Sequence, residues 1–452
     1  MGCTRKALKL NAMAIDGFEG TANEVRTKVE GFRQLAEAGG RNEWLELAAA
    51  LNSQGYFLSP ENGTLNPDRQ ILMRALGLKR ESLEIRERNL SSFHMDLARS
   101  YNNLAITLRD LGMLSEARQH VERAVRIRGR RMTRGEAGHT LIDQNMARID
   151  ELLARRERLD QLICSHFRGH QGTCSVYASD QEERRVISLR YTQHGTESVV
   201  ADTVETSDQD EDVFESGSTI KIFIDTVLQL LISRGEIDGN QTIKYLEEDR
   251  VGGSGVLKTT DPGGSYRLDD VVTWMVTVSD NIATNMIIRL LGVDRINREI
   301  KKMGFERTEL LHKLDFPARH DFGKTTAKEL GRLLRGLLEG ESIVSREVAE
   351  IVLGHLGKQQ NSKIIAASLP PYLINTCDRE KNVVTILSKS GTMNDVRADA
   401  GIVISPWGAY VVVLMAKGFP ETMEYDNHPS VLALRKASAF LFTYYSALGI
   451  SS

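Results

Sequence analysis

The sequence predicts an α+β protein, in which an all-α region of helical repeats precedes an α/β sandwich with a mainly antiparallel sheet. In the N-terminal third, Leu, Ala, Arg and Glu recur at helical spacing, and the pattern repeats after 42 residues. From about residue 172 the pattern changes to the alternation that is typical of strands. At 452 residues the chain is also too long for one ordinary core. We therefore predict two domains, residues 1–168 and 169–452.

The helical repeat is a pair of helices, and its second copy is the clearer one. Apolar positions of the first copy recur 42 residues later, Ala75, Leu83 and Ile85 becoming Ala117, Val125 and Ile127. The run ARSYNNLA…LRDLG within residues 92–132 resembles the tetratricopeptide repeats of kinesin-light-chain type. A single pair cannot bury its apolar face, so such pairs stack and leave a concave surface for a partner. We therefore expect the region to bind a protein partner or, alternatively, to serve as a bundle for self-association.

The second domain begins with two predicted strands, residues 174–179 and 185–191, and three more are predicted at 383–388, 400–405 and 409–416. Helices should cover both faces of their sheet. The last of these helices, residues 430–449, should pack against the sheet.

Composition excludes several classes of function. A net charge of -3 predicts no nucleic-acid partner. No stretch has the roughly 18 apolar residues of a membrane span, and the first twenty residues lack the apolar core of an export signal, so we expect a cytoplasmic protein. The glycines of VGGSGVLK, residues 251–258, do not match a phosphate-binding loop and predict a loop beside the active site. We expect no cofactor.

Four metal-capable side chains gather where the two domains should meet: Cys164, His166, His170 and Cys174. Their spacing fits no standard zinc pattern, and the cluster runs from a helix end into a strand. We therefore expect no metal site.

A serine and a lysine three residues apart, Ser218 and Lys221, open a helix in the segment 213–235. One helical turn separates them, so both lie on one face. A serine hydroxyl becomes a strong nucleophile when a neighbouring base takes its proton, and a buried lysine beside another cation can serve as that base.

Two further motifs follow in order. Ser279-Asp280-Asn281 precedes a second amphipathic helix, and Lys389-Ser390-Gly391-Thr392 closes the strand of residues 383–388. The ordered set S-x-x-K, S-D-N and K-[ST]-G resembles class A β-lactamases and penicillin-binding proteins, a resemblance that covers roughly residues 172–450.

The resemblance implies a role for each motif residue. Ser218 would be acylated, with Lys221 as its proton-transfer partner. Ser279 would relay a proton to the leaving group, and Asn281 would hold the substrate amide and the active-site lysine. Lys389 would supply positive potential, while the N–H groups of Ser218 and Thr392 would form the oxyanion hole. Asp280 would be structural.

The expected substrate is a small or peptide-like acyl donor that carries a carboxylate. Four residues would bind it: Ser390, Gly391, Thr392 and Arg397. For Arg397, a surface position at a strand end is the alternative.

One departure from the resemblance concerns removal of the acyl group. Class A β-lactamases activate the attacking water with a glutamate in an E-x-x-L-N segment, which the matching region, residues 307–326, lacks. The nearby candidates for a replacement base are Glu309, His312, Asp315 and His320. Acylation is therefore better supported than hydrolysis of the acyl-enzyme, and an amide or ester hydrolase or an acyltransferase fits the sequence.

Two alternatives remain open. The fold could sense a ligand without catalysis while the repeats relay the signal to a partner. A glutaminase-like amidohydrolase shares S-x-x-K and the K-S-G strand but differs at the S-D-N position.

Overall fold

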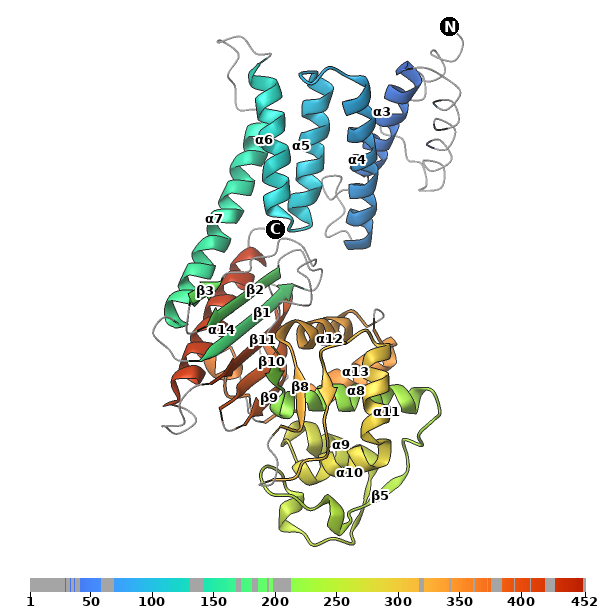
Figure 1. Cartoon of the computed structure of the whole chain (residues 1–452), viewed down its shortest axis with the longest axis vertical. Coiled ribbons are helices and arrows are strands. Elements are labelled where there is room, and N and C mark those ends of the chain that lie inside the picture. The colour runs from blue at the N-terminus through green and yellow to red at the C-terminus, as the bar shows by residue number, and fades with distance from the viewer. Residues whose placement is uncertain are drawn as a thin grey trace. The chain divides into compact units, whose positions relative to one another are not determined.

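A computed structural model describes the following residues: 29, 33, 36, 41–57, 69–130, 141–167, 172–180, 186–192, 195–197, 213–316, 321–340, 343–360, 362–371, 373–374, 384–393, 395–406, 408–418 and 427–449. They form two compact units, one up to Glu157 and the other from Arg158 onward (Figure 1). The predicted boundary after residue 168 falls outside the described residues and stays a prediction.

The first unit consists of consecutive helices; each of α3 to α6 packs against the next, and the first part of α7 adds residues to their core. Their bounds are α3 (Arg41–Phe57), α4 (Arg69–Asn89), α5 (Met95–Asp110), α6 (Leu114–Gly129) and the first part of α7 (Leu141–Phe167). The residues that recur after 42 positions occupy equivalent places: Ala75 and Ala117 are fully buried, and Ile85 and Ile127 are nearly so. The predicted helical repeat is therefore confirmed.

Helix α7 contributes to both units. Ile142 and Ile149 pack into the core of the first unit, whereas Leu159, Ile163 and Phe167 belong to a core of the second. The apolar residues of one continuous helix thus belong to the cores of both units.

A six-stranded antiparallel sheet organises the second unit. Its order is β3-β2-β1-β11-β10-β9, with β1 (Thr173–Asp180), β2 (Val186–Thr192), β3 (Gly195–Glu197), β9 (Thr385–Thr392), β10 (Arg397–Ser405) and β11 (Gly408–Lys417). The predicted strands are confirmed. Strand β9 lies at one edge of the sheet. It pairs with β10 as far as Thr392, opposite Arg397, so the strand continues through the K-S-G motif.

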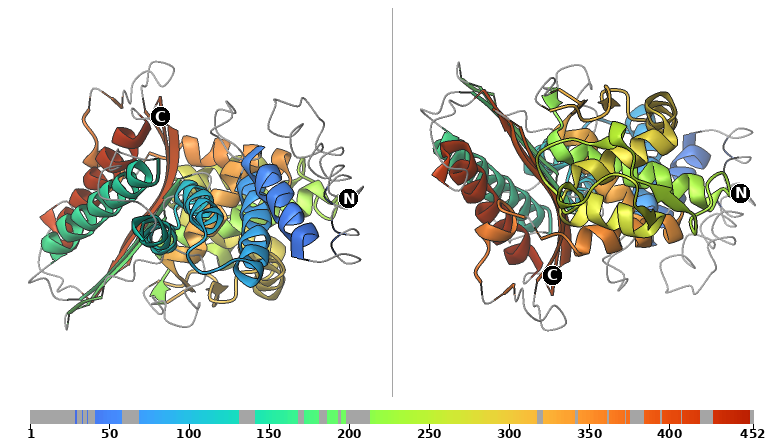
Figure 2. Two further views of the ribbon diagram at one scale, coloured as in Figure 1. Left: turned by 90° about the horizontal axis from the view of Figure 1, so that it is seen from above. Right: turned by 90° about the horizontal axis from the view of Figure 1, so that it is seen from below.

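Helices cover both faces of this sheet, as Figure 2 shows in its edge-on views. One face packs against the end of α7 and against α14 (Pro429–Gly449). The other packs against α12 (Ala327–Glu339) and α13 (Arg346–Gly357). The core on that side extends further to α8 (Lys221–Ser233), α9 (Leu268–Thr277), α10 (Asn281–Leu291) and α11 (Val293–Lys302). None of the helices in the described ranges is long and apolar enough to cross a membrane.

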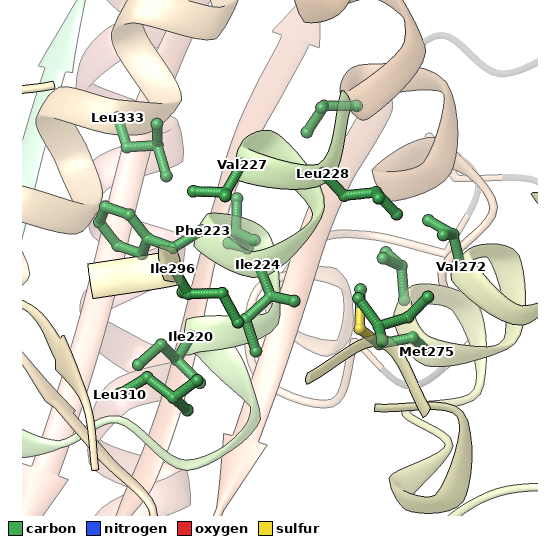
Figure 3. Close-up of a cluster of buried hydrophobic side chains, with 14 of the residues drawn as sticks. Ile220, Phe223, Ile224, Val227, Leu228, Val272, Met275, Ile296, Leu310 and Leu333 are labelled. Carbon is green, nitrogen blue, oxygen red and sulfur yellow. The ribbon is translucent and has the colours of Figure 1, made fainter. Parts of the chain in front are cut away.

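Helix α8 lies at the centre of the larger core. Phe223, Ile224 and Val227 point from it toward Ile296 of α11 and Leu333 of α12 (Figure 3). Ten residues of α8 are buried, the polar Lys221 and Asp225 among them, because other helices pack around it. The helix that begins at Lys221 is therefore held rigidly from several directions.

Short strands complete the second unit. They are β4 (Phe214–Glu215), β7 (Glu309–Leu310) and β8 (Gly323–Thr325) in one small sheet, and β5 (Thr242–Lys244) and β6 (Ser265–Arg267) in another. Strand β4 ends just before Ser218 and pairs with β8.

A buried ion pair joins α8 to α13. His355 Nδ1 lies 2.9 Å from Asp225 Oδ2, and its Nε2 lies 3.8 Å from Asp269 Oδ1. Burial lowers the pKa of His355, but the charge and hydrogen bond of Asp225 outweigh burial, so that the pKa is raised above its ordinary value.

Replacing His355 by asparagine should therefore destabilise the protein in a pH-dependent way. Because the pKa of His355 is higher in the folded than in the unfolded protein, its ion pair stabilises the fold fully below the unfolded pKa of about 6.5. This stabilisation is lost as the pH rises through the folded pKa. We expect the variant to lose about 1–3 kcal/mol at pH 5.5 and clearly less at pH 9, measured by urea unfolding at both values. A loss of equal size at both would contradict this account of the pair.

Candidate active site

Ser218 lies in a 3₁₀ turn, Gly217–Ile220, that runs directly into α8. Two hydrogen bonds fix the turn: Ser216 N donates to Gly323 O at 2.8 Å, and Thr219 Oγ1 donates to Ser216 O at 2.6 Å. Ser218 itself is half-buried. The structure thus places this serine at a helix start, as the sequence predicts.

Lys221 is completely buried one turn further on. Its Nζ donates to Ser279 O at 2.8 Å, to Asn281 Oδ1 at 3.0 Å and to Ser279 Oγ at 3.2 Å. Burial and then the positive charge of Lys389 lower the pKa of Lys221 well below its ordinary value, although Asp280 opposes them. A lysine whose pKa is lowered in this way is a candidate general base.

Ser279 connects the lysine to the nucleophile. Its Oγ donates to Ser218 Oγ at 2.9 Å, and the link from Lys221 to Ser218 runs through this hydroxyl. Ser279 has a φ of +57°, the only positive value among the described residues other than glycine. Such a backbone is strained for a serine and occurs where the surrounding structure enforces it. The strained backbone of the α9–α10 turn therefore places this hydroxyl next to Ser218.

Asp280 fixes that turn. Its side chain caps α10 by accepting from Ala283 N at 2.9 Å, and its other oxygen accepts from Val256 N at 2.6 Å and Leu257 N at 2.8 Å. The carboxylate is fully buried and binds two segments far apart in the sequence. This arrangement fits the structural role expected for Asp280.

Asn281 ties the same loop to the site. Its Nδ2 donates to Gly252 O at 3.0 Å, while its Oδ1 accepts from Lys221. The backbone N of Asn281 donates to Ser254 O at 3.0 Å. The glycine-rich segment 251–258 thus lies beside the active site, where the sequence predicts a loop.

Lys389 approaches Ser279 from the edge strand β9. Its Nζ donates to Ser279 Oγ at 3.0 Å and to Ser390 O at 2.8 Å, and the residue is completely buried. Burial lowers the pKa of Lys389 to about 7, and the charge of Asp399 opposes this effect. Two amines therefore converge on one serine hydroxyl.

Two glycines allow the turn that carries Ser218 to approach β9 closely. Gly217 has a φ of +49°, and a Cβ on it would lie 3.2 Å from Thr392 N. A Cβ on Gly391 would lie 2.9 Å from Ser216 O and 3.0 Å from Ser218 N. The backbone N–H groups of Ser218 and Thr392, expected to form the oxyanion hole, thus belong to segments in direct backbone contact.

Adding a methyl group at Gly391 should weaken this hole. In Gly391→Ala the new Cβ must displace the backbone around Ser218 N, and loss of one oxyanion donor typically costs about 10²–10³-fold in rate. We expect a decrease of about that size in Ser218 acylation, measured as adduct formation by mass spectrometry. The matched control is Gly354→Ala on α13, where nothing lies within 4 Å of the added Cβ. Equal rates in both variants would contradict the assignment.

The remaining predicted binding residues lie along the β9–β10 hairpin. Ser390 is half-buried and Thr392 is exposed. Arg397 is buried, and its Nη1 donates to Met393 O at 2.5 Å and Val396 O at 3.0 Å. It pairs with Thr392 in the sheet register, and its side chain thus helps to close the hairpin rather than lying on the surface.

The three described candidates for a water-activating base do not converge on the nucleophile. Glu309 forms an ion pair with Lys324 at 2.7 Å, His312 bonds to Lys313 O, and Asp315 is exposed. His320 lies outside the described residues. Within those ranges, no carboxylate or imidazole hydrogen-bonds to the hydroxyls of Ser218 and Ser279 or to the amine of Lys221.

The three described residues of the metal-capable cluster lie on two elements. Cys164 is buried in α7 and Cys174 in β1, where burial raises the pKa of Cys174 far above its ordinary value. His166 Nδ1 lies 2.9 Å from Leu162 O. His170 lies outside the described residues.

Comparison with known proteins agrees with this geometry. A family model described as the β-lactamase enzyme family matches residues 155–445, more than half of the chain. The chain belongs to the β-lactamase enzyme family. A tetratricopeptide-repeat model matches residues 72–130, which supports the repeat-like character of the N-terminal helices.

Individual relatives of this β-lactamase family member are distant. β-Lactamase BRO-1 of Moraxella catarrhalis is 23% identical over 201 residues, which span 42% of this chain and 64% of that protein, slightly less than two thirds of its length. A β-lactamase structure from Sphaerobacter thermophilus covers 65% of this chain and 98% of its own, with a TM-score of 0.51 and 22% identity. An acyl-enzyme complex of a PBP-A mutant with penicillin G covers 66% and 98%, with a TM-score of 0.53 and 23% identity. These structures establish the fold.

Two groups of the second unit were missed by the sequence interpretation. Asp399 is a fully buried carboxylate on β10, and its signal in the sequence is one acidic residue inside the apolar run 398–404. The pair of Asp225 and His355 leaves a weaker signal, because its members are 130 residues apart.

Proposed function

We propose that this chain is a serine acyl-transfer enzyme that forms an acyl-Ser218 intermediate. The observation that carries the proposal is the continuous path from Lys221 Nζ through Ser279 Oγ to Ser218 Oγ, with steps of 3.2 and 2.9 Å. Hydroxyl protons can rotate, so the path can pass a proton in either direction. A nucleophile, a relay and a base are thereby within hydrogen-bond reach of one another.

The first step is attack by Ser218 Oγ on the acyl carbon of an amide, ester or β-lactam. As the new C–O bond forms, the Ser218 proton moves to Ser279 and the Ser279 proton moves to neutral Lys221. The carbonyl oxygen becomes an oxyanion that accepts from the N–H groups of Ser218 and Thr392. This step requires a lysine that is unprotonated at working pH, which the lowered pKa of Lys221 supports.

In the second step the tetrahedral intermediate collapses. The bond to the leaving nitrogen or oxygen breaks, and that atom takes a proton from Ser279, which Lys221 then reprotonates. The product is an ester on Ser218. Protons and electron pairs balance without a further reagent.

The acyl donor is best described as a small or peptide-like molecule with an anionic group. Lys389 places a buried amine beside Ser279, and the exposed Thr392 lies at the same strand end. Ammonium and hydroxyl donors together suit a carboxylate. Arg397 adds positive charge to the hairpin, but its Nη1 already donates to main-chain carbonyls.

The acyl-enzyme is proposed to persist or to pass to an acceptor other than water, such as an amine. The support is that, within the described ranges, no carboxylate or imidazole bonds to the catalytic hydroxyls or to Lys221. Water is a poor nucleophile toward an ester without such a base. Rapid antibiotic hydrolysis does not fit this arrangement.

The experiment follows one adduct over time. Protein is mixed with penicillin G, excess drug is removed, and intact mass is recorded with and without glycinamide as an amine acceptor. We expect one penicilloyl group per chain that decays slowly in buffer. Faster decay with glycinamide, and formation of the amide product, would identify acyl transfer. Rapid decay in buffer with repeated turnover would contradict the proposed fate of the acyl group.

The helical repeats are proposed to bind a protein partner. The match of residues 72–130 to the tetratricopeptide-repeat model and the stacking of α3 to α6 support this role. Size-exclusion chromatography with light scattering distinguishes a partner-binding monomer from the alternative, a self-associating bundle. A monomeric full-length chain is the expected result, and a stable dimer lost on deletion of the repeats would favour the alternative.

A further inference from the structure

Asp399 is a buried carboxylate that the catalytic steps above do not use. It has no exposed surface, and its Oδ2 accepts from Ile365 N at 3.0 Å, Ser362 Oγ at 3.2 Å and Ile364 N at 3.3 Å. Its Oδ1 has no hydrogen-bond partner among the described residues. A carboxylate buried in this way is costly unless a positive charge lies nearby.

That charge is Lys389, on the neighbouring strand. In the antiparallel register Asp399 stands opposite Ser390, and Lys389 stands opposite Ala400, so the two charged residues are one position out of register on adjacent strands. Side chains alternate along strands, so Asp399 lies on the sheet face of Leu414, covered by α14, while Lys389 lies on the face of the catalytic helix. The carboxylate therefore acts on the amine across the sheet, without occupying space in the active site.

The electrostatics of the two groups agree with this geometry. Burial raises the pKa of Asp399 to about 6, while hydrogen bonds from Ile365, Ile364 and Ser362 and the charge of Lys389 work in the opposite direction. Burial lowers the pKa of Lys389 to about 7, and Asp399 opposes that decrease. Without Asp399, Lys389 would lose the charge that favours its cationic form near neutral pH.

Other charged side chains on the surrounding elements have different partners. Lys221 directs its amine at Ser279 and Asn281. Arg397 on β10 donates to carbonyls of the hairpin. Arg435 of α14 donates to Lys363 O at 2.7 Å. The hydrogen bonds that Asp399 receives come from Ser362, Ile364 and Ile365.

We propose that Asp399 is a positioning residue whose buried negative charge favours the cationic form of Lys389, so that the active site selects acyl donors carrying an anionic group. Asp399 acts through Lys389 and touches neither the donor nor Ser218. This inference rests on the proposed acylation of Ser218 and extends it to the choice of substrate.

The test compares two reagents that acylate or phosphonylate the same serine. Penicillin G carries a carboxylate, whereas a fluorophosphonate ester is neutral. The measured ratio is the second-order labelling rate constant for penicillin G divided by that for the fluorophosphonate. It isolates recognition of the anionic group, because both reactions depend on the same Lys221 base. In Asp399→Asn, the amide retains an acceptor for the Ile364 and Ile365 N–H groups but removes the charge.

At pH 7.5 the ratio should fall by about ten-fold in Asp399→Asn, because Lys389 then lacks the negative charge that favours its protonated form. The ratio should recover toward the wild-type value at pH 5.5, where Lys389 is protonated again. Asp395→Asn is the matched control, since Asp395 is exposed in the same hairpin and its charge is screened by solvent. It should leave the ratio unchanged.

A double-mutant cycle separates charge from structure. Arginine stays cationic without a counter-charge, so in a Lys389→Arg background Asp399→Asn should no longer alter the ratio. If Asp399→Asn fails to fold, as judged by circular dichroism, Ser362→Ala is the second variant. It removes one hydrogen bond from the charged carboxylate and should lower the ratio in the same direction by a smaller factor.

Several results would overturn the inference. A ratio that does not change in Asp399→Asn, or that falls equally at pH 5.5 and 7.5, would show that Lys389 does not depend on this carboxylate. An equal decrease in the Lys389→Arg background would indicate a structural role. Failure of the wild-type protein to react with either reagent would instead refute the proposed acylation, and the two failures are thereby distinct.

Discussion

Replacing Lys221 by methionine should lower the rate of Ser218 acylation by roughly 10²–10⁴-fold, the usual contribution of a general base. Methionine fills much of the buried space but cannot accept the proton that Ser279 relays from Ser218. The rate is measured as fluorophosphonate labelling, because that reagent requires the nucleophile without the anionic group.

The matched control is Lys258→Met. Lys258 is an exposed lysine of the loop beside the active site, and its Nζ donates to Gly253 O at 3.0 Å. This variant should label at the wild-type rate. Comparable losses in both variants would mean that the decrease reflects charge around the site, and a Lys221→Met protein that labels normally would remove Lys221 from the mechanism.

Replacing Asp280 by alanine should cost about 3 kcal/mol in the free energy of unfolding. The change removes the cap of α10, worth about 1 kcal/mol. It also leaves the N–H groups of Val256 and Leu257 without their acceptor, and for the buried one, Leu257 N–H, this costs about 1–3 kcal/mol. Urea unfolding followed by circular dichroism measures the loss.

Two variants calibrate this prediction. Asp280→Asn keeps an acceptor oxygen and should lose less than the alanine variant. Asp294→Ala removes an exposed acidic residue from the first turn of α11 and should change stability by no more than about 0.5 kcal/mol. If Asp280→Ala were as stable as Asp294→Ala, the loop 251–258 would not depend on this carboxylate.

Local patterns predicted much of the second unit. The alternation of apolar residues identified the strands, because successive side chains of a strand point to opposite faces of the sheet. The three motifs also predicted which segments meet, although they lie up to 171 residues apart, from Ser218 to Lys389. That knowledge came from their resemblance to a family, since spacing alone cannot bring distant segments together.

Other features of the site depend on tertiary structure and had no local signal. The positive φ of Ser279 is imposed by its neighbours, and serine has no preference for that conformation. The link between Ser218 and Lys221 through Ser279 depends on the packing of α8 against the α9–α10 turn. Asp399 could be recognised as unusual in an apolar strand, but its relation to Lys389 follows only from the register of β9 and β10.

The extent of β9 illustrates the same limit. The sequence predicts a strand that closes before Lys389, because the K-S-G-T segment is polar. In the structure β9 continues to Thr392, because each residue of the motif pairs with β10. Backbone pairing in a hairpin outweighs the weak strand preference of serine and glycine.

The most direct test of the account is the location of the covalent adduct. Wild-type protein and Ser218→Ala are each treated with a fluorophosphonate, and the mass of the intact chain and of its proteolytic fragments is recorded. The account predicts one adduct per wild-type chain, located on Ser218, and none on the alanine variant. An unmodified wild-type protein, or an adduct that forms equally well on Ser218→Ala, would contradict it.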